Sequence, residues 1–403
     1  MQMIEGGVCA PQGFKAAGVH CGIRKNKQKK DLALIVSDRE AAAAAVYTKN
    51  LVKGAPINVT KRHLENGRAR AIICNSGNAN TCNSDGEQVA AGMCRLAAEK
   101  IACDPSDIIV ASTGVIGQRL PIEPIKNGMD ALYSALGDNS GDASEAILTT
   151  DTVKKEIAVS FTLGGKTCRM GGIAKGSGMI HPNMATMLVF ICTDAAISPK
   201  LLQKALSEDT ENSFNMISID GDTSTNDMCC ILANGMAENA EICEENDDYF
   251  EFRRALSVVT TNLCRKIAAD GEGATKLLEC VVENALNQAT AKTVAKSVVC
   301  STLFKAAMFG ADANWGRVLC AIGYSGAAVD VQKIDLSFCS KAGEIAVCKN
   351  GAGVDFSEED AKKILSEKEI TIKINLNSGD ECAVAWGCDL TYDYVKINGD
   401  YRT

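Results

Sequence analysis

Residues 175–188 combine a flexible approach, a rigid turn and a hydroxyl group in one short stretch, KGSGMIHPNMATML. Two glycines precede a His-Pro-Asn turn, and an apolar run, TMLVFIC, begins at Thr186 and ends at residue 192. This order predicts a loop that places the Thr186 hydroxyl at the start of a buried strand. Threonine suits such a role because its branched Cβ restricts χ1 and holds the oxygen on one side.

A hydroxyl in that position can attack the carbonyl of Ala185 if the turn strains the peptide bond between the two residues. Hydrolysis of the resulting ester leaves Thr186 as a new N-terminus, whose α-amine has a reference pKa of about 7.7–8.0. That amine can then act as the base for its own hydroxyl. The simpler interpretation is that Thr186 is an ordinary strand residue, and sequence physics alone favours it.

The segment KGSGMIHPNMATML resembles the self-cleavage and active-site motif of the glutamate N-acetyltransferase family, also called ornithine acetyltransferases, of arginine biosynthesis. Similar segments run from near the N-terminus to the last residue. The resemblance implies an α/β fold of the N-terminal-nucleophile transferase type, with helices packed on mixed β-sheets in two lobes. It also implies self-cleavage between Ala185 and Thr186 into an α chain, 1–185, and a sheet-rich β chain, 186–403. The two chains would stay associated as an α2β2 heterotetramer.

Residues 107–117, DIIVASTGVIG, predict a strand that runs into a Ser-Thr-Gly turn. A backbone N–H at a glycine turn, with a hydroxyl one residue earlier, can face a developing oxyanion. From the residues alone this is a plain strand end. The resemblance assigns the oxyanion role to Thr113 and Gly114.

The resemblance further implies that substrate is bound by Thr186 together with Thr152, Lys175, Glu272, Asn398 and Thr403. Lys175 would hold a substrate carboxylate as a point charge. Glu272 lies between two glycines, where its carboxylate can pair with the ammonium of ornithine, and an acid on a surface turn is the alternative. Lys154 stands where the family usually has a proline. Thr152 itself is present. Because of the departure at Lys154, however, the shape of the loop around Thr152 does not follow from the resemblance.

The implied reaction is acyl transfer in two halves through a covalent intermediate. Thr186 would take the acetyl group of N-acetyl-L-ornithine, and L-glutamate would then accept it. No metal or organic cofactor is expected. Some members of the family also accept acetyl-CoA as a donor, which the sequence leaves open. Two alternatives remain: an aminopeptidase or amidase with the same nucleophile, and a non-enzymatic amino-acid-binding protein.

Composition and charge argue against several other classes of protein. The 403 residues carry 42 Lys and Arg against 50 Asp and Glu, which argues against a nucleic-acid or anionic membrane partner. No apolar run approaches the roughly 18 residues of a membrane span, and no signal peptide is evident, so a cytoplasmic protein is expected. Nineteen cysteines, an odd number with several in apolar runs, indicate small buried side chains. The three histidines show no metal-ligand spacing.

Alternation and helical spacing predict the elements that position these residues. Strands are expected at 31–38, 42–49, 69–74, 333–341, 344–351, 369–379 and 381–399. Helices are expected at 249–269 and 289–309, a polar linker at 137–144, and a hairpin turn at Gly164 and Gly165. Residues 220–227, DGDTSTND, are rich in oxygen ligands, but Ile231 occupies the position where a calcium loop has its glutamate. A structured active-site loop is therefore preferred to a metal site.

Overall fold

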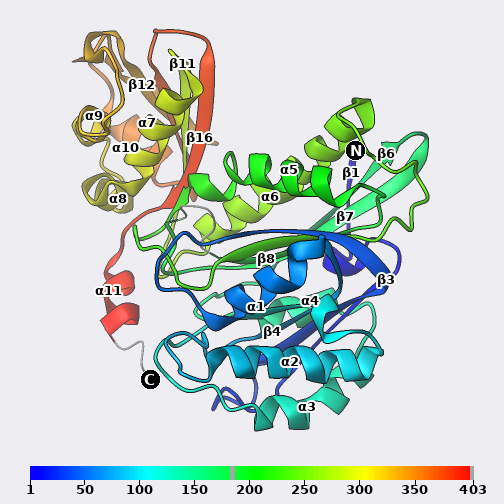
Figure 1. The fold of residues 1–403 in the computed structure, drawn as a ribbon. Coiled ribbons are helices and arrows are strands. Elements are labelled where there is room, and N and C mark those ends of the chain that lie inside the picture. Colours follow the sequence, from blue (N-terminus) through cyan, green and yellow to red (C-terminus); the bar gives the residue numbers. More distant parts are fainter. Residues whose placement is uncertain (182–186, 400–403) are drawn as a thin grey trace. The chain divides into compact units, whose positions relative to one another are not determined.

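The computed structural model describes residues 1–181 and 187–399, which form two compact units (Figure 1). Within those residues, unit 1 contains 1–176, 187–214 and 223–263, and unit 2 contains 177–181, 215–222 and 264–399. Each unit is built on one β-sheet with helices packed against it. The predicted α/β class with mixed sheets is confirmed.

The sheet of unit 1 has nine strands within the described residues. Their order is β1 (Gln2–Ile4), β6 (Lys155–Leu163), β7 (Lys166–Lys175), β8 (Leu188–Thr193), β10 (Met228–Ala233), β3 (Leu32–Tyr47), β4 (Arg68–Asn75) and β5 (Ile108–Ser112), with β2 (Phe14–Val19) also paired to β3. The β8–β10 and β4–β5 pairs are parallel. The other neighbours are antiparallel.

Helices cover both faces of this sheet. They are α1 (Ala55–His63), α2 (Gly86–Ile101), α3 (Glu123–Ser134), α4 (Ser140–Ala146), α5 (Pro199–Thr210) and α6 (Asp247–Ala269), whose last turns belong to unit 2. In Figure 1, α2 and α3 lie beyond β4, α5 and α6 lie beyond β8, and α4 is drawn between these two parts of the sheet. Every residue of β8 and β10 is buried, which explains why these strands are continuously apolar.

The sheet of unit 2 has seven strands within the described residues. Their order is β14 (Ala352–Gly353), β13 (Gly343–Lys349), β12 (Asp335–Ser340), β15 (Glu369–Asn375), β11 (Leu277–Ala285), β16 (Glu381–Cys388) and β9 (Ile217–Ser218). The helices of this unit are α7 (Gln288–Cys300), α8 (Thr302–Phe309), α9 (Trp315–Gly323), α10 (Glu358–Leu365) and α11 (Tyr392–Gly399). The β11–β15 and β9–β16 pairs are parallel, and the other pairs are antiparallel.

Two predicted strands are in fact one. The predicted strands at 31–38 and 42–49 form the single 16-residue strand β3. Its pairing with β4 shifts between Val36 and Ala41, and the polar residues 38–40 that suggested a break are exposed there. An irregularity of this kind lets a strand continue through a polar interruption.

Three further predictions are wrong. The predicted linker at 137–144 overlaps helix α4, which begins at Ser140, ends at Ala146 and packs its small residues against β2 and β3. The helix at 289–309 is divided into α7 and α8 at Ser301, which is extended and whose hydroxyl accepts the Phe304 N–H (3.3 Å). The strand at 381–399 ends at Cys388, and residues 392–399 form α11. The hairpin turn is confirmed, with φ of +52° at Gly164 and +80° at Gly165.

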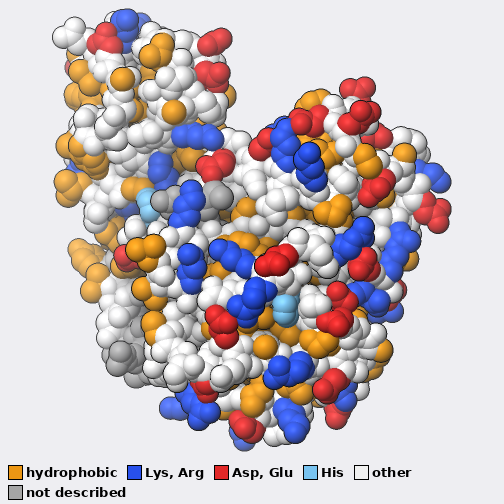
Figure 2. Space-filling model, in the orientation of Figure 1, with side chains coloured by type: hydrophobic (Ala, Val, Ile, Leu, Met, Phe, Trp, Pro, Cys, Tyr) orange, Lys and Arg blue, Asp and Glu red, His pale blue; other side chains and the backbone are white. Residues whose placement is uncertain are grey.

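The face shown in Figure 2 intersperses Lys and Arg with Asp and Glu, without a broad field of one sign among the described residues. Among the described residues, some charged side chains pair across elements, as Arg62 with Glu87 and Arg68 with Glu40 (both 3.0 Å). Among the helices of the described ranges, none is both long and apolar enough to cross a membrane.

Candidate active site

Three predicted site residues, Ala185, Thr186 and Thr403, lie outside the described residues. The strand predicted to follow Thr186 is present as β8. The carbonyl of Met187 accepts the Met228 N–H (2.9 Å), so the pairing with β10 reaches the residue just before β8 begins. The chain is therefore anchored in the sheet of unit 1 one residue after Thr186.

Thr113 and Gly114 follow β5 and are held against the turn after β4. The Thr113 N–H donates to the Asn75 carbonyl (3.0 Å), and the Thr113 side chain is buried. Gly114 has φ of +133°, and a Cβ there would lie 2.3 Å from the carbonyl carbon of Gly77 and 2.5 Å from the nitrogen of Asn78. Glycine is therefore required at Gly114 both by its backbone conformation and by the close approach of a second backbone segment.

Asn226, which was not among the predicted site residues, fastens the same turn from the loop at 223–227. Its Nδ2 donates to the carbonyls of Ser112 (3.0 Å) and Ala79 (2.5 Å), and its Oδ1 accepts the Thr81 (2.6 Å) and Thr225 (2.5 Å) hydroxyls. This part of the oxygen-rich loop thus supports the residue that precedes Thr113. No cluster of metal-binding side chains is found within residues 1–181 and 187–399.

Lys175 ends β7 beside a buried carboxylate that the sequence did not point to. Asp151 lies 2.7 Å from the Nζ of Lys155 and 4.0 Å from the Nζ of Lys175, and the side chains of Asp151 and Lys155 are 0% exposed. Asp151 also accepts the N–H groups of Gly176 (2.6 Å) and Thr149 (3.0 Å). Burial raises the pKa of Asp151, but the Lys175 and Lys155 ammonium groups outweigh it and hold that pKa well below its usual range.

The two lysines differ in burial and in their distance from Asp151. Lys155 is fully buried in a short ion pair, whereas Lys175 retains some exposure and lies farther from the carboxylate. The Lys175 ammonium is therefore the cation better placed to meet a ligand. Thr152, next to Asp151 in sequence, is exposed.

A second buried carboxyl, Asp227, lies at the start of β10. Burial raises its pKa well above the usual value, a Ser224 hydrogen bond and the charge of Lys175 lower it in part, and its Oδ2 has no hydrogen-bond partner in the described structure. Lys175 thus acts on two buried acidic groups, Asp151 and Asp227.

Glu272 and Asn398 are brought together in unit 2. Asn398 Nδ2 donates to Glu272 Oε2 (2.7 Å), and the Glu272 N–H donates to the Ser177 carbonyl (2.9 Å). A Cβ at Gly178 would lie 2.3–2.4 Å from the Glu272 carboxylate, so a larger residue there would displace that carboxylate. Glu272 is 6% exposed, and the alternative of an acid on a surface turn is wrong.

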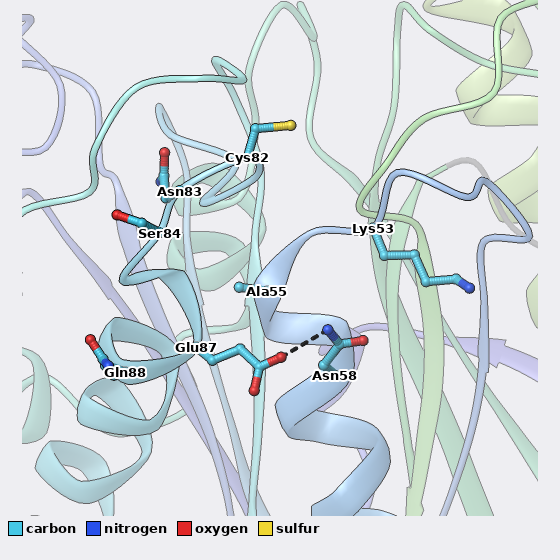
Figure 3. Close-up of a pocket in the computed structure, with 8 residues that line it drawn as sticks. All are labelled: Lys53, Ala55, Asn58, Cys82, Asn83, Ser84, Glu87 and Gln88. Atoms are coloured by element: carbon cyan, nitrogen blue, oxygen red, sulfur yellow. Dashed lines mark hydrogen bonds between the residues drawn. The ribbon is translucent and has the colours of Figure 1, made fainter.

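A pocket of about 380 Å³ opens beside the turn that contains Cys82 (Figure 3). It is lined by Lys53, Ala55, Asn58, Cys82, Asn83, Ser84, Glu87 and Gln88. Asn58 donates to Glu87 (2.9 Å) across it, and hydrogen bonds from Asn58 and Arg62 lower the pKa of Glu87. None of these lining residues is a predicted site residue.

Comparison with known proteins gives matches over the whole chain. The model of the ArgJ family matches residues 15–403. The arginine biosynthesis bifunctional protein ArgJ 1 of Clostridium acetobutylicum is 50% identical over 392 residues, which cover 97% of this chain and 96% of that protein. The corresponding ArgJ of Bacillus subtilis is 48% identical over 402 residues, 99% of this chain and 97% of that protein.

One solved structure matches part of the chain. The crystal structure of arginine biosynthesis bifunctional protein ArgJ from Bacillus halodurans has 47% sequence identity and a TM-score of 0.50. The match covers 52% of this chain and 97% of that one. With the family match over nearly all residues and relatives near 50% identity, the chain belongs to the ArgJ family.

Proposed function

We propose that this chain is a glutamate N-acetyltransferase, or ornithine acetyltransferase, that moves an acetyl group from N-acetyl-L-ornithine to L-glutamate in arginine biosynthesis. The observation that carries the proposal is the alignment of nearly all of the chain with arginine biosynthesis bifunctional proteins at about 50% identity. The geometry around Thr113, Lys175 and Glu272 supports it, because these predicted site residues lie in buried, hydrogen-bonded settings.

The enzyme would first cleave itself. The Thr186 hydroxyl oxygen bonds to the carbonyl carbon of Ala185, the C–N bond breaks, and the hydroxyl proton ends on the nitrogen, which becomes an α-amine. Water then hydrolyses the ester to a carboxylate on Ala185 and the free hydroxyl of Thr186. The Bacillus halodurans chain supports this step, because 97% of it aligns with only 52% of this chain. That share is close to the 218 of 403 residues that follow Ala185.

Acetyl transfer would then proceed in two halves. The α-amine of Thr186 takes the proton of its hydroxyl, the oxygen attacks the acetyl carbonyl of N-acetylornithine, and Thr113 with Gly114 stabilises the oxyanion. The proton passes to the departing nitrogen of ornithine, and an acetyl-Thr186 ester remains. In the second half the amine of glutamate attacks that ester, which releases N-acetylglutamate and restores the hydroxyl.

Charged side chains would hold the substrates. Lys175 binds a carboxylate, which is supported by the closer pairing of Asp151 with Lys155 (2.7 Å) than with Lys175 (4.0 Å). Glu272, fixed by Asn398, binds the ammonium group of ornithine. Thr152 and Thr403 complete the proposed set of substrate-binding residues.

The proposed chemistry uses no metal or organic cofactor. Acetyl-CoA as an alternative donor fits the word bifunctional in the names of the relatives. We place the enzyme in the cytoplasm as an α2β2 heterotetramer of the two cleaved chains.

The test compares wild type with Thr186→Ala, and with Thr167→Ala as a matched control at an exposed threonine of β7. Intact masses under denaturing conditions should show chains of 185 and 218 residues for wild type and control, and one full-length chain for Thr186→Ala. Wild type and control should transfer labelled acetyl from N-acetylornithine to glutamate, and Thr186→Ala should not. Release of acetate to water without transfer would favour the hydrolase, and an uncleaved, inactive wild type would favour the binding protein.

A further inference from the structure

The Asp220 carboxylate holds the backbone of the segment that leads to the proposed cleavage site. Its Oδ2 accepts the Met179 N–H (2.6 Å) and its Oδ1 accepts the Ile180 N–H (2.9 Å). The Ile219 N–H in turn donates to the Ile180 carbonyl (2.7 Å). Two consecutive residues, five and six positions before Ala185, are thus bonded to the loop that carries Asp220.

Met179 adopts a backbone conformation that is unfavourable for methionine. Its φ is +56°, in the left-handed region that disfavours residues with a Cβ. Its side chain is 43% exposed, so packing does little to hold the residue in place. The two hydrogen bonds to an ionised carboxylate are of the stronger kind and are the evident force that keeps the turn in this shape.

The neighbouring contacts show that this segment is fixed along its length. The Ser177 hydroxyl donates to the Asp270 carbonyl (2.6 Å), and His181 Nδ1 lies 3.1 Å from the Ser218 hydroxyl. The two residues bonded to Asp220 lie between these anchors in sequence, and Asp220 differs from the anchors in contributing a carboxylate acceptor to two adjacent N–H groups.

We propose that Asp220 is a positioning residue for self-cleavage. By holding the backbone of Met179 and Ile180, Asp220 restricts the direction in which the chain enters the scissile segment. The Thr186 hydroxyl would then adopt an attack geometry toward the Ala185 carbonyl more often. The bond changes are those of the proposed cleavage, and Asp220 takes no part in them. The inference rests on the proposed function, because it concerns that reaction.

The same contacts give a role to a carboxylate of the oxygen-rich loop at 220–227, which resembles a metal-binding loop in sequence. Both oxygens of Asp220 accept backbone N–H groups, and Oδ1 also accepts the Asp222 N–H (3.2 Å). The carboxylate therefore has a structural task that needs no cation.

The experiment uses the full chain made by cell-free translation, with intact masses read over time for wild type, Asp220→Asn and Asp222→Asn. Asparagine keeps the size of Asp220, but its amide nitrogen cannot accept an N–H, so one of the two backbone donors loses its partner. We expect Asp220→Asn to cleave at least tenfold more slowly than wild type. Asp222→Asn, in the same loop but without a side-chain bond to residues 179–180, should stay within twofold.

A second substitution separates positioning from folding. Met179→Gly lowers the free-energy cost of the left-handed conformation at residue 179. Added to Asp220→Asn, it should therefore raise the cleavage rate at least threefold above that of Asp220→Asn alone. The effect of Asp220→Asn on the melting temperature is measured by circular dichroism in the uncleaved Thr186→Ala chain, with and without Asp220→Asn.

Three outcomes overturn the proposal. Cleavage of Asp220→Asn at the wild-type rate removes it while leaving the proposed function intact. Slow cleavage without rescue by Met179→Gly, together with a lower melting temperature, assigns Asp220 to general folding. An uncleaved wild type refutes the proposed function as well, which distinguishes the two failures.

Discussion

Replacing Asp151 by Asn is expected to destabilise the protein more than any exchange of a surface charge. Asp151→Asn leaves the Lys155 ammonium, which is 0% exposed, without the carboxylate now 2.7 Å away. Breaking a buried ion pair by removing one partner costs about 3–5 kcal/mol of unfolding free energy. Since native proteins are stable by only about 5–15 kcal/mol, the loss is a large share of the total.

The double variant Asp151→Asn with Lys155→Met tests the electrostatic origin of that loss. It removes both buried charges and keeps an apolar chain of similar length. Buried ion pairs replaced by apolar residues are often neutral in stability, so most of the lost 3–5 kcal/mol should return, to within about 1–2 kcal/mol of wild type. The control is Asp38→Asn, which breaks a 3.0 Å pair with Lys15 whose side chains are 46% and 50% exposed. That change should cost about 0–1 kcal/mol.

The same ion pair determines how the stability contribution of Asp151 should depend on pH. Because the pKa of folded Asp151 lies well below its unfolded value of about 3.9, its contribution is fully present above that unfolded value and is lost as pH falls through the folded pKa. The difference between wild type and Asp151→Asn should therefore be equal at pH 7 and pH 5 and shrink below about pH 4.

Urea unfolding followed by circular dichroism measures all four proteins. The reasoning is refuted if Asp151→Asn lies within about 1 kcal/mol of wild type, the range expected of an exposed pair. It is also refuted if the double variant is no more stable than Asp151→Asn, since removal of the Lys155 charge would then have gained nothing.

Two further substitutions test the oxyanion turn and the segment before the cleavage site. Gly114→Ala places a Cβ 2.3 Å from Gly77 and should lower kcat for acetyl transfer by about 100-fold or more. The control is Gly117→Ala, which is also at positive φ but has open space around it and should retain activity. Equal losses of activity in the two variants would contradict the steric argument. Burial and Lys296 lower the pKa of His181 to about 4, so between pH 6.5 and 4 the unfolded chain binds more protons and stability falls as pH falls. His181→Gln should reduce the difference in melting temperature between pH 7 and pH 5, and an unchanged difference would count against this assignment.

The local sequence pattern is sufficient to predict the strands, turns and helices whose conformation is determined by their own residues. The strand after Thr186 is apolar throughout because β8 is buried on both faces, and the Gly164–Gly165 hairpin needs the positive φ that glycine supplies. The α6 helix is close to its predicted range because its spacing is sustained over many turns.

The remaining features depend on contacts between distant residues. Helix α4 is short and rich in small polar residues, and packing against β2 and β3 decides its conformation. The partner of Lys175 is 24 residues away in sequence, and the carbonyls that Asn226 holds lie more than 100 residues away. Nothing in the local sequence distinguishes these polar residues from surface ones. The likeness to a family led to Thr113, Lys175 and Glu272, but not to Asp151, Asp220 or Asn226.

The order of strands in unit 1 has a consequence for how the cleaved enzyme would hold together. Strands β8 and β10 come from the piece after Ala185, yet they are inserted between β7 and β3 of the piece before it. The two polypeptides would thus behave as a split protein whose halves complete one another. Separating them would require tearing open the centre of a sheet, so dissociation should be as slow as global unfolding, and neither half expressed alone should acquire a native core.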